Sequence, residues 1–167
     1  MKKLINIPNI ITFIRFLLSP VFIYFLIKQN TKLALSIVAI NIIADGLDGF
    51  VARILKQETK FGRIFDLLTD AFFFLICLIG LTYYKYIELS ITLIIILSGL
   101  IKSVSFIIRK NIVSSRWSKL SGLLLSILII CSLILPILYQ IIKWPIVLYN
   151  ILISLIRIYQ AIIIRKL

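Results

Sequence analysis

The residues of this chain best suited to chemistry are its aspartates. All four aspartates of the 167-residue chain lie in one short stretch, at Asp45, Asp48, Asp66 and Asp70. The first two are three residues apart and the last two are four apart, so on a helix each pair shares one face. Carboxylates set in strongly apolar sequence are costly and mark a functional site. Because the chain has no histidine, an all-oxygen cage for a hard cation such as Mg²⁺ or Mn²⁺ is expected.

Small residues interrupt the same stretch, which is otherwise rich in large apolar residues. They are Gly46, Gly49, Ala52 and Gly62. A helical glycine costs about 1 kcal/mol relative to alanine, so its use here indicates that a bulky group approaches the backbone. Close helix packing would give the same pattern. Arg53 lies one turn after Gly49 and could hold a diphosphate through a charge-assisted fork, or could serve only to set the membrane topology.

Composition places these acids in a membrane protein. Hydrophobic residues make up 62% of the chain, which is typical of polytopic membrane proteins. The apolar runs are continuous, so they predict helices rather than barrel strands. Six runs have about the 20 residues that cross a bilayer, over 9–27, 33–53, 63–84, 89–108, 120–139 and 144–163. We expect a single all-α membrane domain over residues 1–167, with a short interfacial segment at 2–8.

The distribution of lysine and arginine predicts the orientation in the membrane. Of the 19 basic residues, thirteen fall on one expected side and two lie within spans, which leaves four on the other side, Lys28, Lys32, Lys85 and Lys143. The basic side should be cytoplasmic and should carry both termini and the aspartates. The net charge of +13 could also indicate nucleic-acid binding. Because the basic residues occupy short loops beside spans, contact with anionic lipid is favoured and no nucleic-acid partner is expected.

The aspartates, the small residues and the arginine between them follow one pattern: Asp45-x2-Asp48-Gly49-x2-Ala52-Arg53-x8-Gly62-x3-Asp66-x3-Asp70. This pattern resembles the signature of the CDP-alcohol phosphotransferase family, and the six-span layout is similar to that family too. The resemblance implies transfer of a phosphatidyl-type group from a CDP-alcohol, such as CDP-diacylglycerol, to a hydroxyl acceptor, with release of CMP. It also implies a homodimer.

The resemblance assigns roles to the site residues as well. Asp45, Asp48, Asp66 and Asp70 would hold two metal ions, Mg²⁺ or Mn²⁺, with Asp66 and Asp70 catalytic. Asp70 would also be the general base, in agreement with the lack of histidine in the chain. The cytidine diphosphate would be accommodated by four residues of the signature, Gly49, Ala52, Arg53 and Gly62.

The N-terminal run NIPNIITFIRFLLSP resembles the opening of phosphatidylglycerophosphate synthases and of CDP-diacylglycerol-type cardiolipin synthases. Within it, Asn9, Thr12 and Arg15 recur every three residues, so we expect them on one helix face as a polar wall of the substrate cavity. The alternative is an arginine that snorkels to the interface beside two helix-start residues.

The chain also departs from those two groups of synthases. They typically carry proline after the third aspartate and lysine after the last, where this chain has Leu67 and Ala71. Of two usual lysines before the fifth span, only Lys119 is kept. Glycerol 3-phosphate is the expected acceptor, and cardiolipin synthase or another transferase of the family is the alternative. The residues expected to bind the acceptor or its phosphate are Asn9, Arg15, Lys102, Arg109, Arg116, Lys119 and Arg157; lipid contact is the alternative for the basic loop.

An ion or proton transporter is the alternative of a different class, because acids within a membrane also line ion paths. Transporters commonly repeat their site in two halves of the chain. The three expected spans after Glu88 contain no acid, which favours the enzyme. An inactive member of the family that only binds lipid is a further alternative, against which the four intact aspartates argue.

Overall fold

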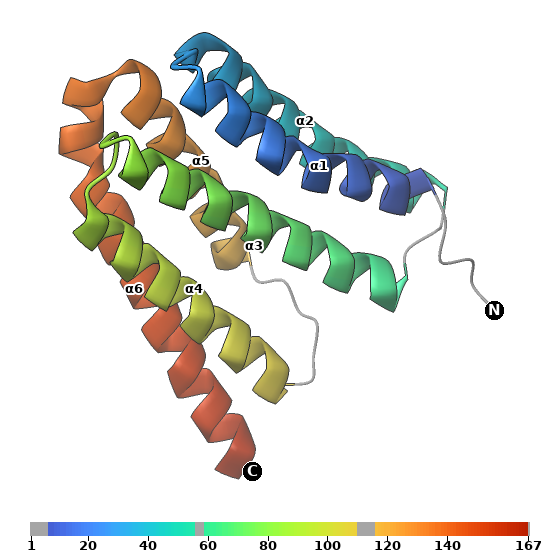
Figure 1. Ribbon diagram of the computed structural model, residues 1–167. Helices are drawn as coiled ribbons and strands as arrows, with labels where there is room; N and C mark the ends of the chain where they lie inside the picture. Colours follow the sequence, from blue (N-terminus) through green and yellow to red (C-terminus); the bar gives the residue numbers. More distant parts are fainter. Residues whose placement is uncertain (1–6, 56–58, 110–115, 167) are drawn as a thin grey trace. The chain divides into compact units, whose positions relative to one another are not determined.

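The regular structure of the chain is helical throughout the described residues. The computed structural model describes residues 7–55, 59–109 and 116–166 (Figure 1). The helices are α1 (Ile7–Ile27), α2 (Thr31–Ile54), α3 (Lys60–Tyr83), α4 (Leu89–Arg109), α5 (Arg116–Ile134) and α6 (Pro136–Lys166). The all-α prediction is confirmed. Most of the interfacial segment expected at residues 2–8 lies outside the described ranges, and Ile7 and Pro8 already belong to α1.

Four of these helices are long and apolar enough to cross a membrane. The qualifying segments are Ile7–Ile27, Thr31–Ile54, Phe61–Tyr83 and Pro136–Gln160. The apolar parts of α4 and α5 are shorter over their described residues, at Leu89–Val104 and Leu120–Ile134. Large apolar side chains are exposed along all six helices, as expected for surfaces that face lipid. The chain is therefore a membrane protein, and the expected count of six spans is only partly confirmed.

The predicted break between the last two spans was misplaced. We expected one span to end at 139 and the next to begin at 144, with Lys143 in the loop. Instead α5 ends at Ile134 and α6 begins at Pro136, so that Lys143 lies inside α6. The residue before a proline is pushed away from helical dihedrals, which explains a break at Leu135. A proline can start a helix at little cost because the first N–H groups have no partner within the helix.

The first of two compact units spans Met1–Tyr84 and contains α1, α2 and α3. Its central element is α1, which packs against both α2 and α3 (Figure 1). The core is built from Phe22 and Leu26 of α1, Val38 of α2 and Phe73 of α3, all almost completely buried. A Cβ on Gly80 of α3 would lie 2.6 Å from Ile23 Cδ1, so this glycine permits the close approach of α1.

Caps and a tight turn set where the helices of this unit begin. Asn30 caps α2 by accepting a hydrogen bond from the Leu33 amide at 3.1 Å, after a left-handed Gln29 with φ of 53°. Thr59 caps α3 by accepting from the Gly62 amide at 2.9 Å. This cap fixes where α3 begins, and Asp66 and Asp70 follow it by about two and three turns.

The second unit, Lys85–Leu167, contains α4, α5 and α6, with α6 packed against both of the others. Glu88, just before α4, accepts hydrogen bonds from Lys143 and Tyr139 of α6. Partial burial alone would raise the pKa of the Glu88 carboxyl, but these two hydrogen bonds outweigh it and lower the pKa to about 2. Glu88 is therefore ionised at neutral pH and its charge is balanced by Lys143.

Candidate active site

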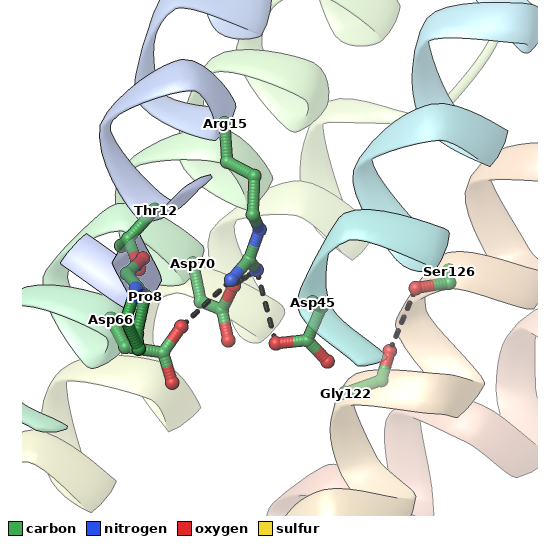
Figure 2. Close-up of polar contacts among 8 residues, drawn as sticks. All are labelled: Pro8, Thr12, Arg15, Asp45, Asp66, Asp70, Gly122 and Ser126. Carbon is green, nitrogen blue, oxygen red and sulfur yellow. Dashed lines mark hydrogen bonds and ion pairs between the residues drawn. The ribbon is translucent and has the colours of Figure 1, made fainter. Parts of the chain in front are cut away.

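Three of the four aspartates come together in space. Carboxylate oxygens of Asp45 on α2 and of Asp66 and Asp70 on α3 all lie within 4.8 Å of one another (Figure 2). Asp48 lies on α2, three residues after Asp45, and its side chain is outside the described residues. Carboxylates this close repel one another strongly unless a cation lies among them.

In this structure the cation among the carboxylates is Arg15 of α1. Its Nη1 lies 2.7 Å from Asp66 Oδ1, and its Nη2 lies 3.1 Å from Asp45 Oδ1 and also bonds Asp70 Oδ1 (Figure 2). Arg15 is 0% exposed, whereas the side chains of Asp45, Asp66 and Asp70 are 51%, 38% and 33% exposed. The guanidinium thus holds the carboxylates from the protein side, and their outer sides remain open.

The carboxylates of α2 and α3 meet through a third helix, α1. Over their described residues, α2 and α3 do not approach each other closely along their backbones, and α1 packs against both. Asp45 meets Asp66 and Asp70 across α1, through Arg15. The sequence predicts Arg15 on a polar wall of the substrate cavity, but it does not predict that this arginine, 30 residues before Asp45, bonds the aspartates directly.

The donor set fits a hard divalent cation. Every potential ligand atom of the three carboxylates is an oxygen, which suits Mg²⁺ or Mn²⁺ and not a soft metal. The partial exposure of all three side chains leaves room for the water molecules that Mg²⁺ usually retains. The three carboxylates can therefore hold a divalent metal ion.

The small residues of the signature divide into two kinds. Among the described residues of the first unit, a Cβ added to Gly46 or Gly49 would meet no atom within 4 Å, so packing within that unit does not require either glycine. A Cβ on Gly62 would lie 2.8 Å from Asn9 Oδ1 and 3.0 Å from Thr59 Oγ1. The lack of a side chain at Gly62 therefore lets the start of α3 lie close to Asn9 of α1.

The other residues of the signature stretch lie at the end of α2. Ala52 is partly exposed, and Arg53 is exposed in the last turn of the helix. A cation near a helix C-terminus interacts favourably with the helix dipole, so this position suits an arginine with or without a ligand.

Asn9, Thr12 and Arg15 share the buried face of α1, as their spacing indicated. The Thr12 hydroxyl donates to the Pro8 carbonyl at 3.1 Å (Figure 2). Asn9 lies against Gly62, and Arg15 reaches the carboxylates. This face therefore links the aspartates to the start of α3.

The expected acceptor residues of the second unit are only partly described. Lys102 of α4 bonds Ser121 of α5 and Asn150 of α6, and Arg157 of α6 is 8% exposed. The side chains of Arg109, Arg116 and Lys119 are outside the described residues. Sequence reasoning missed Asn150, although an asparagine seven residues before Arg157 in an apolar span puts two polar groups on one helix face.

Comparison with known proteins gives the site its context. The sequence model of the CDP-alcohol phosphatidyltransferase family matches residues 5–156, which include all four aspartates and both compact units in large part. The chain belongs to this family. The predicted resemblance is thereby confirmed.

Several curated proteins are similar to this CDP-alcohol phosphatidyltransferase family member. The CDP-diacylglycerol–glycerol-3-phosphate 3-phosphatidyltransferase of Aquifex aeolicus is 35% identical over 94 residues, 56% of this chain and 53% of that protein. The protein of the same name from Cereibacter sphaeroides is 35% identical over 98 residues, 54% of this chain and 44% of its own length. The cardiolipin synthase (CMP-forming) of Streptomyces coelicolor is 30% identical over 100 residues, 56% of this chain and 46% of that protein. The chain spans about half the length of the curated relatives it matches.

Proposed function

We propose that this protein transfers a phosphatidyl group from a CDP-alcohol such as CDP-diacylglycerol to a hydroxyl acceptor and releases CMP. The observation that carries the proposal is the convergence of Asp45, Asp66 and Asp70 within 4.8 Å, inside a chain whose family is defined by CDP-alcohol chemistry. Glycerol 3-phosphate is the proposed acceptor, which agrees with the names of two of the relatives described above.

The four aspartates are proposed to hold the metal, as Mg²⁺ or Mn²⁺, in two positions. When bound, the metal supplies positive charge to a phosphoryl centre that carries negative oxygens. Gly49, Ala52 and Arg53 would receive the cytidine diphosphate, because the backbone at Gly49 is open and Arg53 is exposed on the same helix end. Gly62 would contribute by keeping the start of α3 close to Asn9.

Asp70 is the proposed general base and Asp66 its catalytic neighbour. The Asp70 carboxylate would take the proton of the acceptor hydroxyl, and that oxygen would then form a bond to the phosphorus attached to the lipid. The bond from this phosphorus to the bridging oxygen breaks, and CMP leaves with that oxygen. Arg15, bound to both carboxylates, would fix their orientation during this exchange.

The acceptor phosphate is proposed to bind to basic residues of the second unit. Lys102 and Arg157 are the described members of this group, and Arg109, Arg116 and Lys119 are proposed from the sequence alone. Lys102 and Arg157 are close enough for their charges to interact, and residues 85–167 contain no acid other than Glu88. A cluster of basic side chains of this kind attracts an anionic acceptor.

An acceptor panel tests this function. Membranes containing the protein would be incubated with radiolabelled CDP-diacylglycerol and with glycerol 3-phosphate, phosphatidylglycerol, serine or inositol phosphate in turn. We expect CMP release and labelled lipid with glycerol 3-phosphate. Product with phosphatidylglycerol alone would assign the chain as a cardiolipin synthase, the alternative that the Streptomyces coelicolor relative represents. No product with any acceptor would contradict the proposed transferase activity and would favour the alternative function of an ion or proton transporter.

A further inference from the structure

A second polar cluster lies inside the second unit, where three helices each contribute one residue. The Lys102 Nζ of α4 lies 2.7 Å from Asn150 Oδ1 of α6 and 3.0 Å from Ser121 Oγ of α5. The Ser121 hydroxyl also donates to Asn150 Oδ1, at 3.2 Å. Asn150 is 0% exposed and Ser121 is buried, so this is an interior network and not a surface contact.

The Asn150 side chain is held in one orientation. Its Nδ2 donates to the Ile146 carbonyl of its own helix at 2.9 Å. Only the amide nitrogen can donate to a carbonyl, so the oxygen must be the atom turned toward Lys102 and Ser121. A buried amide whose oxygen and nitrogen are both bonded in this way fixes the groups around it.

The groups around the partly buried Lys102 ammonium come from its own unit. Both partners of Lys102 in these bonds are neutral, and the Arg157 guanidinium is close enough to act on it electrostatically. Glu88, the one acid of residues 85–167, is bound to Lys143 and lies fourteen residues before Lys102, about 21 Å along a helix. The oxygens of Asn150 and Ser121 thus fix where the ammonium lies between α4, α5 and α6.

We infer that Asn150, assisted by Ser121, is a positioning residue that holds the Lys102 ammonium for the phosphate of the acceptor. This inference rests on the proposed function, in which Lys102 binds the phosphate. Asn150 does not touch the acceptor in this scheme, and its whole effect passes through Lys102.

A double-mutant cycle with glycerol 3-phosphate tests the inference. Asn150→Leu should raise KM for glycerol 3-phosphate about tenfold and leave kcat and KM for CDP-diacylglycerol within about twofold. Lys102→Ala should raise the same KM about ten- to a hundredfold. If Asn150 acts through Lys102, the double variant should match Lys102→Ala alone, because the two effects are then not additive.

Two further variants guard against simple misfolding. Asn150→Asp keeps an oxygen acceptor but neutralises the ammonium, so it should raise KM for glycerol 3-phosphate at least as much as Asn150→Leu. Ser121→Ala should raise that KM about two- to threefold. Its matched control is Ser132→Ala, a buried serine of the same helix whose hydroxyl donates to the Ile129 carbonyl, which should leave KM unchanged. Thermal unfolding in detergent would check that each variant is folded.

The outcomes separate the inference from the function on which it rests. If Lys102→Ala leaves KM for glycerol 3-phosphate unchanged, the proposed acceptor site is wrong and the inference fails with it. If Lys102→Ala raises KM but Asn150→Leu and Asn150→Asp do not, or if the effects of Lys102→Ala and Asn150→Leu multiply, the role of Asn150 is overturned while the acceptor site stands.

Discussion

At the scale of single residues, Arg15 is the feature that most changes the description of the site. An arginine buried in an apolar helix is costly unless its charge is balanced, and here three carboxylates balance it. The same carboxylates would repel one another without it. Arg15 and the aspartates are therefore interdependent, and the site has a positive charge of its own before any metal binds.

Replacing Arg15 should reveal this dependence. In the presence of a chelator, Arg15→Gln should lose stability, because three clustered carboxylates lose their counter-ion. We expect a loss of about 1–3 kcal/mol, below the usual cost of breaking a buried pair because the carboxylates are partly exposed. Thermal unfolding in detergent measures it. Arg63→Gln, which removes an exposed charge from the same helix as Asp66, should have little effect. Equal stability of the two variants would contradict the role of Arg15.

Metal removal tests the carboxylates themselves. A chelator should abolish activity, and Mg²⁺ or Mn²⁺ should restore it, because the donor atoms are all oxygens. Asp66→Asn should remain inactive at every Mg²⁺ concentration while still folding. Full activity in metal-free buffer, or better recovery with Zn²⁺ than with Mg²⁺, would argue against an oxygen-ligand site.

At the scale of elements, α1 is the central helix of the first unit, because it packs against both α2 and α3. Its inward face carries Asn9 against Gly62 and Arg15 against the aspartates. The contact at Gly62 sets how closely the start of α3 approaches α1. The glycines of the signature therefore differ: a side chain at Gly62 would meet Asn9 and Thr59, whereas Gly46 and Gly49 have open space beside them.

Two matched alanine substitutions test this difference. Gly62→Ala places a Cβ 2.8 Å from Asn9 Oδ1 and 3.0 Å from Thr59 Oγ1. Both atoms are ends of side chains that can shift, so we expect a loss of about 1 kcal/mol, the lower end of overpacking costs. Gly49→Ala meets no atom within 4 Å and should leave stability unchanged or raise it by up to about 1 kcal/mol. If a CDP-alcohol approaches the backbone there, Gly49→Ala should nevertheless raise KM for it. Unfolding curves and steady-state kinetics on both variants give the answer. A Gly49→Ala variant with unchanged KM would remove this residue from the substrate site.

At the scale of the whole molecule, two three-helix units lie in one chain and divide its charged residues unequally. All four aspartates belong to the first unit, and the second has Glu88 alone among its acids. We propose that the aspartates and both termini lie on the cytoplasmic side and that the protein works as a homodimer. The distribution of basic residues supports the first proposal, and the family resemblance supports the second.

Cysteine labelling tests the orientation. Cys77 and Cys131 are buried, so a single exposed cysteine should react selectively. In intact bacterial cells, Gln29→Cys in the turn after α1 should react with a membrane-impermeant maleimide, because this turn is expected on the outer face. Leu55→Cys, just after α2, should react only after the membrane is permeabilised. The reverse pattern would place the aspartates on the outer face.

The sequence by itself determined the membrane class, the helical fold and the group of aspartates. Each depends on local chemistry. In lipid, a continuous apolar run can satisfy its backbone hydrogen bonds only as a helix or in a closed barrel. Asp66 and Asp70 are four residues apart, so they share a helix face whatever the rest of the fold is. Pro136 also encodes the break at Leu135 locally, whereas the charge of Lys143 predicts a break eight residues too late.

Only the tertiary structure decided which distant residues complete each polar cluster. Arg15 lies 51 residues from Asp66, and Lys102 lies 48 from Asn150. Spacing along a helix says which residues share its face, but not which helix that face meets or at what register. Helix packing sets these contacts, so the counter-ion of the aspartates and the asparagine that holds Lys102 become visible only when α1 and α6 are packed in their units.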